Sequence, residues 1–159
     1  MLTLRDATLS DAAEIVAMIR ELADYEQLLD RCKASEENIR GALFSPHPKV
    51  FCTIAEWEGK AAAFALYFYN FSTFRAQHGI YLEDLFVRPE FRRKGIAKAL
   101  FTHLAQKVVR EGCGRLDWQV LDWNEDALRF YASLGAVSLK EWVPQRLEGE
   151  ALHALAAQA

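Results

Sequence analysis

Tyr81-Leu-Glu-Asp-Leu-Phe-Val-Arg-Pro-Glu-Phe-Arg-Arg-Lys-Gly-Ile-Ala97 is the stretch that decides the fold of this 159-residue chain. Its apolar first part predicts a strand, its proline a turn, and its basic, glycine-bearing part a loop that opens a helix. Such a loop directs unpaired backbone N–H groups toward one point, and the helix dipole adds positive potential there. The basic side chains that strengthen this potential are Arg92, Arg93, Lys94 and Lys98. The stretch therefore predicts a pyrophosphate site, with two carboxylates, Glu83 and Asp84, just upstream of it.

Outward from this stretch, the spacing of apolar residues predicts alternating strands and helices. Strands are expected at residues 2–5, 50–57, 60–71, 80–87, 115–121 and 136–147. Helices are expected after Thr8 and Ser35 and over residues 96–110 and 124–134. The order is β-α-α-β-β-β-α-β-α-β. It indicates an α/β fold with a mixed, mostly antiparallel central sheet and helices on both faces.

Composition indicates a single globular domain over residues 1–159, with 52% hydrophobic and 26% charged residues. No apolar run approaches the roughly 20 residues of a membrane helix, and the N-terminus lacks the pattern of a signal peptide. Three widely spaced cysteines match no metal-ligand pattern, and they suggest reduced thiols in a cytoplasmic protein without a bound metal. The net charge of −3 argues against nucleic-acid binding and is compatible with a cationic small substrate.

The glycine loop alone does not identify its ligand. The P-loop pattern, with two glycines before Lys-Ser/Thr, is missing, and so is the dinucleotide pattern of three spaced glycines. The loop reads Arg92-x-x-Gly95-x-Ala97, in which Gly95 lets the backbone approach a ligand closely. A solvated basic turn at a helix start is the structural alternative.

Residues 83–97 resemble the acetyl-CoA-binding motif of the GNAT superfamily of N-acetyltransferases, whose loop pattern is Gln/Arg-x-x-Gly-x-Gly/Ala. Residues 122–136, Asp-Trp-Asn-Glu-Asp-Ala-Leu-Arg-Phe-Tyr-Ala-Ser-Leu-Gly-Ala, resemble the second cofactor motif of that superfamily. Residues 19–26, Ile-Arg-Glu-Leu-Ala-Asp-Tyr-Glu, resemble the first helix of its spermidine/spermine and thialysine branch. The resemblance covers nearly the whole chain and implies the GNAT fold.

The resemblance also implies acetyl-CoA as cosubstrate. The loop backbone would hold the pyrophosphate, and the strand before it would pair with the pantetheine arm as an added strand. Arg92 would order the loop or contact phosphate, and Asn124 would bond the cofactor arm or only cap its helix. The implied cofactor-binding residues are Leu85, Phe86, Val87, Arg92, Arg93, Lys94, Gly95, Ile96, Ala97, Lys98, Asn124, Glu125, Asp126 and Ala127.

Two residues would perform the chemistry that the resemblance implies. Glu83 would accept the amine proton, directly or through water, and Tyr131 would protonate the departing thiolate. A tyrosine suits this role because its phenol, with a pKa of about 10, is protonated at neutral pH. A buried tyrosine with a satisfied hydroxyl is the alternative for Tyr131. Because neighbouring strand residues point to opposite faces, Glu83 and Asp84 are expected on different sides of the sheet.

The implied substrate is a primary amine of a small cation: a polyamine, a diamine or a thialysine-like amino acid. The residues that would line its site are Tyr25, Glu26, Glu83, Asp117, Trp118 and Gln119. Glu26 and Asp117 could equally be ordinary surface residues. A CoA-binding sensor without turnover and a peptide or protein N-acetyltransferase remain alternatives. The resemblance further implies a homodimer.

Overall fold

The structure, a computed structural model, describes residues 1–158. The chain divides into two compact parts, residues 1–119 and a second part that begins at Val120.

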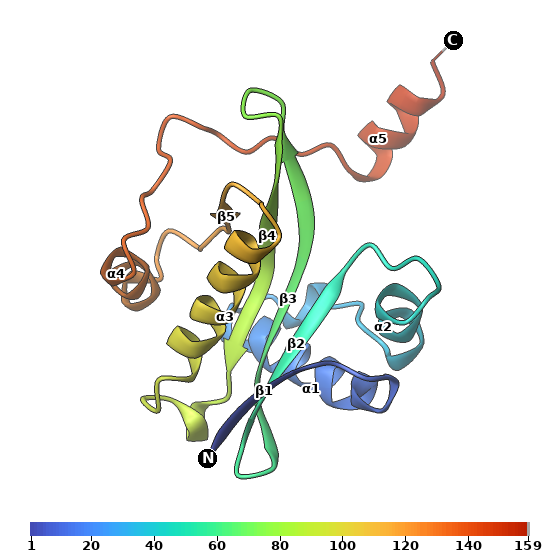
Figure 1. Cartoon of the computed structure of the whole chain (residues 1–159). Helices are drawn as coiled ribbons and strands as arrows, with labels where there is room; N and C mark the ends of the chain where they lie inside the picture. Colours follow the sequence, from blue (N-terminus) through green and yellow to red (C-terminus); the bar gives the residue numbers. More distant parts are fainter. Residues whose placement is uncertain (159) are drawn as a thin grey trace. The chain divides into compact units, whose positions relative to one another are not determined.

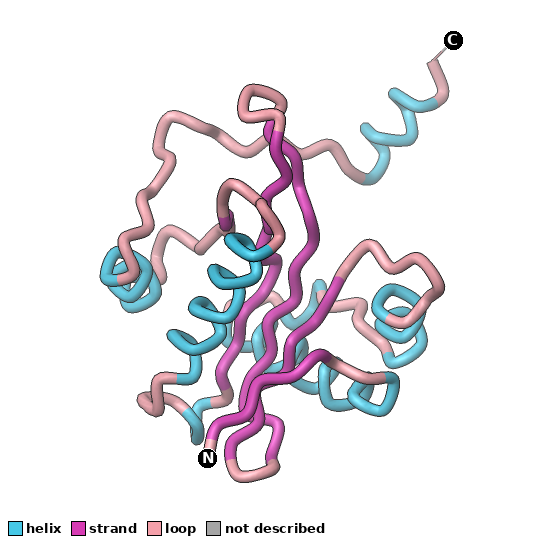
Figure 2. Tube along the Cα trace, in the orientation of Figure 1, coloured by secondary structure: helices cyan, strands magenta, loops and turns pink. Residues whose placement is uncertain are grey.

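The first part is built on a five-stranded sheet in the order β1-β2-β3-β4-β5 (Figures 1 and 2). Its first four strands are antiparallel neighbours, and β5 joins β4 in parallel. The strands are β1 (Leu2–Asp6), β2 (Phe51–Trp57), β3 (Lys60–Ser72), β4 (Gln77–Val87) and β5 (Leu116–Asp117). The mostly antiparallel sheet expected from the sequence is confirmed.

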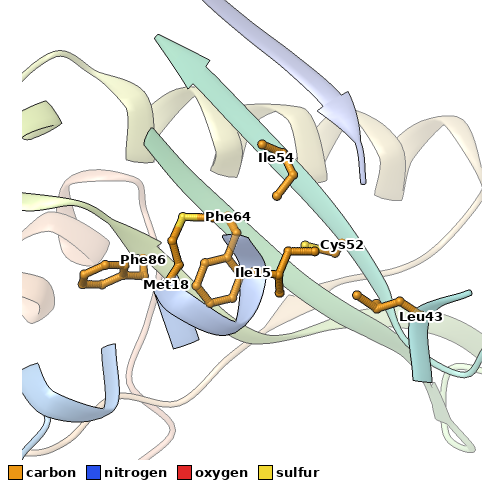
Figure 3. Packing of buried hydrophobic residues seen from close by; sticks show 7 residues of the cluster. All are labelled: Ile15, Met18, Leu43, Cys52, Ile54, Phe64 and Phe86. Carbon is orange, nitrogen blue, oxygen red and sulfur yellow. The ribbon is translucent and has the colours of Figure 1, made fainter. Parts of the chain in front are cut away.

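Helices cover both faces of this sheet, with α3 on one face and α1 and α2 on the other (Figure 1). The α-helices of this part are α1 (Ala12–Tyr25), α2 (Glu36–Leu43) and α3 (Ile96–Arg110), and the short 3-10 helices are η1 (Leu9–Asp11), η2 (Leu29–Arg31) and η3 (Pro89–Phe91). Figure 3 shows the core on the α1 face, where Ile15 and Met18 pack on strand residues that include Phe64 and Phe86. On the opposite face α3 buries a stripe of Ile96, Leu100, Leu104 and Val108.

Local sequence signals explain where these elements begin and turn. Ser35 caps α2, since its hydroxyl accepts the N–H of Asn38 at 3.2 Å. Glu58 and Gly59, at φ 52° and 78°, form the two-residue turn between β2 and β3. Both left-handed residues match the twist that such hairpins require.

The second part contains α4 (Glu125–Ser133) and α5 (Gly149–Ala156). The helix expected over residues 124–134 is confirmed, with Asn124 as its cap. The strand expected over residues 115–121 is reduced to the two residues of β5, and no strand forms over residues 136–147 within the described chain. An alternating pattern alone does not make a strand, because the backbone must also find a neighbour to pair with.

Candidate functional site

The turn before α3 has the backbone shape of an anion-binding loop. Arg93 and Gly95 both adopt left-handed conformations, at φ 61° and 74°. The first helical hydrogen bond of α3 runs from the N–H of Ala99 to the carbonyl of Gly95, so the N–H groups of residues 96–98 precede it. A Cβ built on Gly95 meets no atom within 4 Å. Open space at a helix N-terminus, surrounded by basic side chains, fits a pyrophosphate.

The edge of β4 next to this turn is open. β5 pairs with β4 only at Ile80 and Tyr81, so in the described chain residues 82–87 have a partner strand on the β3 side alone. An extended ligand can pair with such an edge through main-chain groups. Leu85, Phe86 and Val87, the residues expected to hold the pantetheine arm, lie on it.

Arg92 connects this edge to α1. Its Nε donates to the carbonyl of Val87 at 3.1 Å. Its guanidinium lies 5.3 Å from the centre of the Tyr25 ring and 5.9 Å from that of Phe86, both within cation–π range. Of the two roles expected for Arg92, these contacts support ordering of the loop. Lys94 is held in a similar way, with its Nζ 5.0 Å from the centre of the Trp57 ring.

Arg88 fixes the position of α1 against the end of β4. Its guanidinium forms ion pairs with Glu14 and Glu21, the latter at 2.9 Å, and donates to the carbonyl of Ala61 at 3.0 Å. The Arg88 side chain is 16% exposed, so these contacts are screened less than surface ion pairs. The end of α1, which carries Tyr25, is thereby held near the β4 edge.

A β-bulge interrupts β4 at the candidate base. Leu66 pairs with Asp84 and Tyr67 with Leu82, which leaves Glu83 without a partner on β3. A bulge breaks the alternation of side chains along a strand. The expectation that Glu83 and Asp84 face opposite sides rested on that alternation, so it no longer applies at this position.

Two further carboxylates, those of Glu83 and Glu26, lie near Asp84. The pKa of Asp84 is raised to about 6, chiefly by burial and to a lesser degree by the nearby charges of Glu83 and Glu26. Burial also raises the pKa of Glu26, which follows directly after α1. Glu83 itself is exposed. An acidic region with an exposed carboxylate can attract and deprotonate an ammonium group.

Tyr81 joins these carboxylates to β5. Burial raises the pKa of its phenol, as do the charges of Glu83 and Asp117, while a hydrogen bond with the Gln119 side chain lowers it. The Tyr81 ring stacks on Phe68 with 5.0 Å between centroids. Four of the residues expected around the amine, Glu26, Glu83, Asp117 and Gln119, thus act electrostatically or by hydrogen bonding on Asp84 or Tyr81.

Trp118 contacts α3. Its ring meets Phe101 of α3 edge-on, with 4.9 Å between centroids, and it therefore packs on the α3 face of the sheet. Tyr25, by contrast, is 43% exposed beside Arg92 and is accessible to a ligand.

The second part carries the residues of the second cofactor motif. The Asn124 side chain accepts the N–H of Ala127 at 3.3 Å and so caps α4. Glu125 and Asp126 are exposed in the first turn and form ion pairs with Arg129. The ring of Tyr131 lies 5.8 Å from that of Phe130, and its carbonyl accepts the N–H groups that end the helix.

No group of three His, Cys, Asp or Glu side chains in the described part of the chain is arranged to hold a metal ion. None of the described helices is both long and apolar enough to cross a membrane.

Comparison with known proteins assigns the family. The model of the acetyltransferase (GNAT) family matches residues 15–136. A thialysine N-epsilon-acetyltransferase from Bos taurus is 38% identical and covers 96% of both chains. An L-ornithine N5-acetyltransferase from Arabidopsis thaliana is 47% identical over 59% of this chain and 41% of its own. A solved V. cholerae integron cassette protein superposes with a TM-score of 0.83 at 32% identity, over 99% of this chain and 98% of its own.

The chain therefore belongs to the GNAT family of acetyltransferases. The α/β GNAT fold inferred from the resemblance of three motifs along the chain is confirmed, and so is the branch that contains the thialysine and spermidine/spermine enzymes.

Sequence reasoning missed three residues that the structure adds to this region: Tyr81, and also Asn70 and Arg115, whose side chains both contact that of Asp117. The alternation of a strand offered a signal for one of them, because Arg115 shares a face with Asp117 and Gln119. Tyr81 and Asn70 could not be recognised without the pairing of β4 with β5 and with β3.

Proposed function

We propose that this acetyltransferase moves the acetyl group of acetyl-CoA to a primary amine of a small cationic substrate: a thialysine-like or ornithine-like amino acid, a diamine or a polyamine. The observation that carries the proposal is that three features follow one another along one strand. Within β4 and the turn after it lie an exposed carboxylate at a bulge, an open strand edge and an anion-binding helix start. The relatives named for thialysine and ornithine support an amino acid with a side-chain amine.

Acetyl-CoA supplies an acetyl thioester as the acyl donor. The N–H groups at the start of α3, with Arg93, Lys94 and Lys98 beside them, hold its pyrophosphate. The main chain of Leu85, Phe86 and Val87 binds its pantetheine arm, and an N–H near Leu85 or Phe86 stabilises negative charge on the carbonyl oxygen. Asn124 to Ala127 contribute further cofactor contacts.

Glu83 accepts the proton of the attacking ammonium, either directly or through water, because an alkyl amine is mostly protonated at neutral pH. Tyr131 donates a proton to the departing thiolate. The cationic substrate is bound by Tyr25, Glu26, Asp117 and Gln119. We propose that Trp118 also lines this site.

One assay tests this proposal and separates it from its alternatives. Release of CoA from acetyl-CoA is measured with thialysine, lysine, ornithine, putrescine, spermidine and a panel of peptides, beside calorimetric binding of acetyl-CoA. We expect transfer to at least one small amine. Tight acetyl-CoA binding without transfer would indicate a sensor, and transfer to peptides alone would indicate a peptide or protein N-acetyltransferase.

We also propose a homodimer located in the cytoplasm. Residues 136–148 form no strand within the described chain, although Val137, Leu139, Trp142 and Val143 are exposed apolar residues available for pairing. The three cysteines are free thiols, which favours a reducing compartment. Light scattering at working concentration is expected to give twice the mass of the 18.1 kDa chain, and a monomer mass would contradict this.

A further inference from the structure

An ion pair at β5 has the charge layout of an amino-acid head group. The Nε of Arg115 lies 3.0 Å from the Oδ2 of Asp117, and the side chains are 44% and 28% exposed. Asp117 also accepts the amide of Asn70 at 3.3 Å, which ties it to β3. The pair is thus fixed to the sheet and still accessible to solvent, with one positive and one negative group side by side.

Gly79 makes room for this pair. A Cβ at Gly79 would come within 3.2 Å of the Cγ of Arg115 and 2.6 Å of the Oδ1 of Asn70. The Arg115 side chain therefore runs closely over β4. Its ion-pair contact with Asp117 is made by Nε, and no hydrogen bond from its two Nη groups is found within residues 1–158. A guanidinium has five N–H donors, so the Nη end of the fork remains available to a carboxylate.

The pair lies at a suitable separation from the candidate base. Asp117 stands opposite Tyr81 in the parallel register, and Glu83 follows Tyr81 by two residues. Two strand residues span about 7 Å, slightly less at a bulge. The side-chain nitrogen and the α-carbon of ornithine or lysine are about 5–6 Å apart at ordinary bond lengths. Both Glu83 and Asp117 raise the pKa of the Tyr81 phenol, so both lie near that group.

Arg115 is a positively charged residue in a region that otherwise carries carboxylates. A site lined by Glu26, Glu83, Asp84 and Asp117 alone would suit a polyamine and would repel a carboxylate. A guanidinium beside Asp117 reverses part of this preference, since it attracts a carboxylate and disfavours a second ammonium that comes without one.

We infer that Arg115 binds the α-carboxylate and Asp117 the α-ammonium of a zwitterionic amino acid whose side-chain amine is acetylated. This inference rests on the proposed function and narrows it to basic α-amino acids. Arg115 and Asp117 are then specificity residues, and diamines of the same length are poor substrates.

The test compares substrates that differ only in the head group. Lysine has both α-substituents, 6-aminohexanoate lacks the α-ammonium but keeps the carboxylate, and cadaverine lacks the carboxylate but keeps the ammonium. For the wild-type protein we expect kcat/KM for lysine to exceed that for cadaverine at least tenfold, about 1.4 kcal/mol. Arg115→Gln is expected to raise KM for lysine and 6-aminohexanoate about tenfold and to change cadaverine less than twofold. Arg115→Lys should recover part of the loss, because it keeps the charge but not the fork.

Arg110→Gln is the matched control, since it removes the same charge from the exposed end of α3. It should change none of the three substrates. The inference is overturned if wild-type protein uses cadaverine as well as lysine, or if Arg115→Gln reduces both equally. The wild-type comparison needs no variant, so it decides the question even if a substitution impairs folding. Transfer to cadaverine alone would retain the proposed function and refute only the inference, whereas transfer to no amine would refute both.

Discussion

Arg92 of the loop before α3 lies with its guanidinium 5.3 Å from the centre of the Tyr25 ring at the end of α1. This contact joins the segment that binds the cofactor phosphates, as proposed, to a residue that lines the proposed amine site. Since Arg92 also donates to the carbonyl of Val87, its side chain spans the gap between the loop and the strand edge. The two substrates are therefore expected to influence each other's binding through Arg92.

Removing the Tyr25 ring should weaken acetyl-CoA binding, although Tyr25 lies at the end of α1 and not in the loop that is proposed to bind the cofactor. A cation–π contact at a partly exposed site contributes about 0.5–1 kcal/mol, so Tyr25→Leu should raise the Kd for acetyl-CoA roughly two- to fivefold. Tyr25→Phe keeps the ring and serves as the control. Calorimetry measures both, and an equal Kd for Tyr25→Leu and wild type would show that the contact does not order the loop.

A substitution at Gly95 can separate an effect on the stability of the protein from an effect on acetyl-CoA binding. A Cβ there meets nothing within 4 Å, so Gly95→Ala should cost only the left-handed backbone strain of about 1–2 kcal/mol. Gly112, at the other end of α3, has a similar φ of 69° and equally open surroundings. Both alanine variants should lower the free energy of unfolding equally, whereas Gly95→Ala alone should weaken acetyl-CoA binding. Equal binding by the two variants would remove the phosphate role from this turn.

The raised pKa of Asp84 predicts that the stability of the protein depends on pH. Its pKa is raised from 3.8 to about 6 in the folded protein, so between these values the folded state binds more protons than the unfolded state. Stability then falls as pH rises through this window, by roughly 3 kcal/mol at most. The Asp84→Asn variant does not lose stability in this way, because its side chain does not titrate. Its free energy of unfolding, measured with a chemical denaturant, should exceed that of wild type by an increasing amount from pH 4 to pH 7. Parallel pH curves for the two proteins would contradict the burial of this carboxyl.

Much of the first part of the chain could be predicted from sequence, because its strands and helices carry clear periodicity and caps. The bulge at Glu83 could not, since it depends on how β3 and β4 align, and no local pattern reports that. Residues 136–147 have the alternation of a strand but form none, because pairing requires a neighbour that sequence does not specify. The ion pair of Arg115 with Asp117 needed the structure to bring Gly79 and Asn70 beside it.

Tyr131→Phe removes only the proposed acid. Turnover should fall at least tenfold while acetyl-CoA binding persists, because the phenol acts on the leaving thiolate and the ring is retained. Steady-state kcat beside the calorimetric Kd makes this comparison. Unchanged turnover would remove Tyr131 from the reaction.

Glu83→Gln tests the central claim most directly, because this carboxylate stands at the bulge from which the chemistry is proposed. General-base catalysis contributes about 100-fold or more, so kcat/KM for the preferred amine should fall by that factor at neutral pH. The Kd for acetyl-CoA should stay within twofold of wild type. Glu90→Gln, an exposed carboxylate in η3, should change neither quantity. Turnover in Glu83→Gln equal to that of wild type would contradict the proposed mechanism.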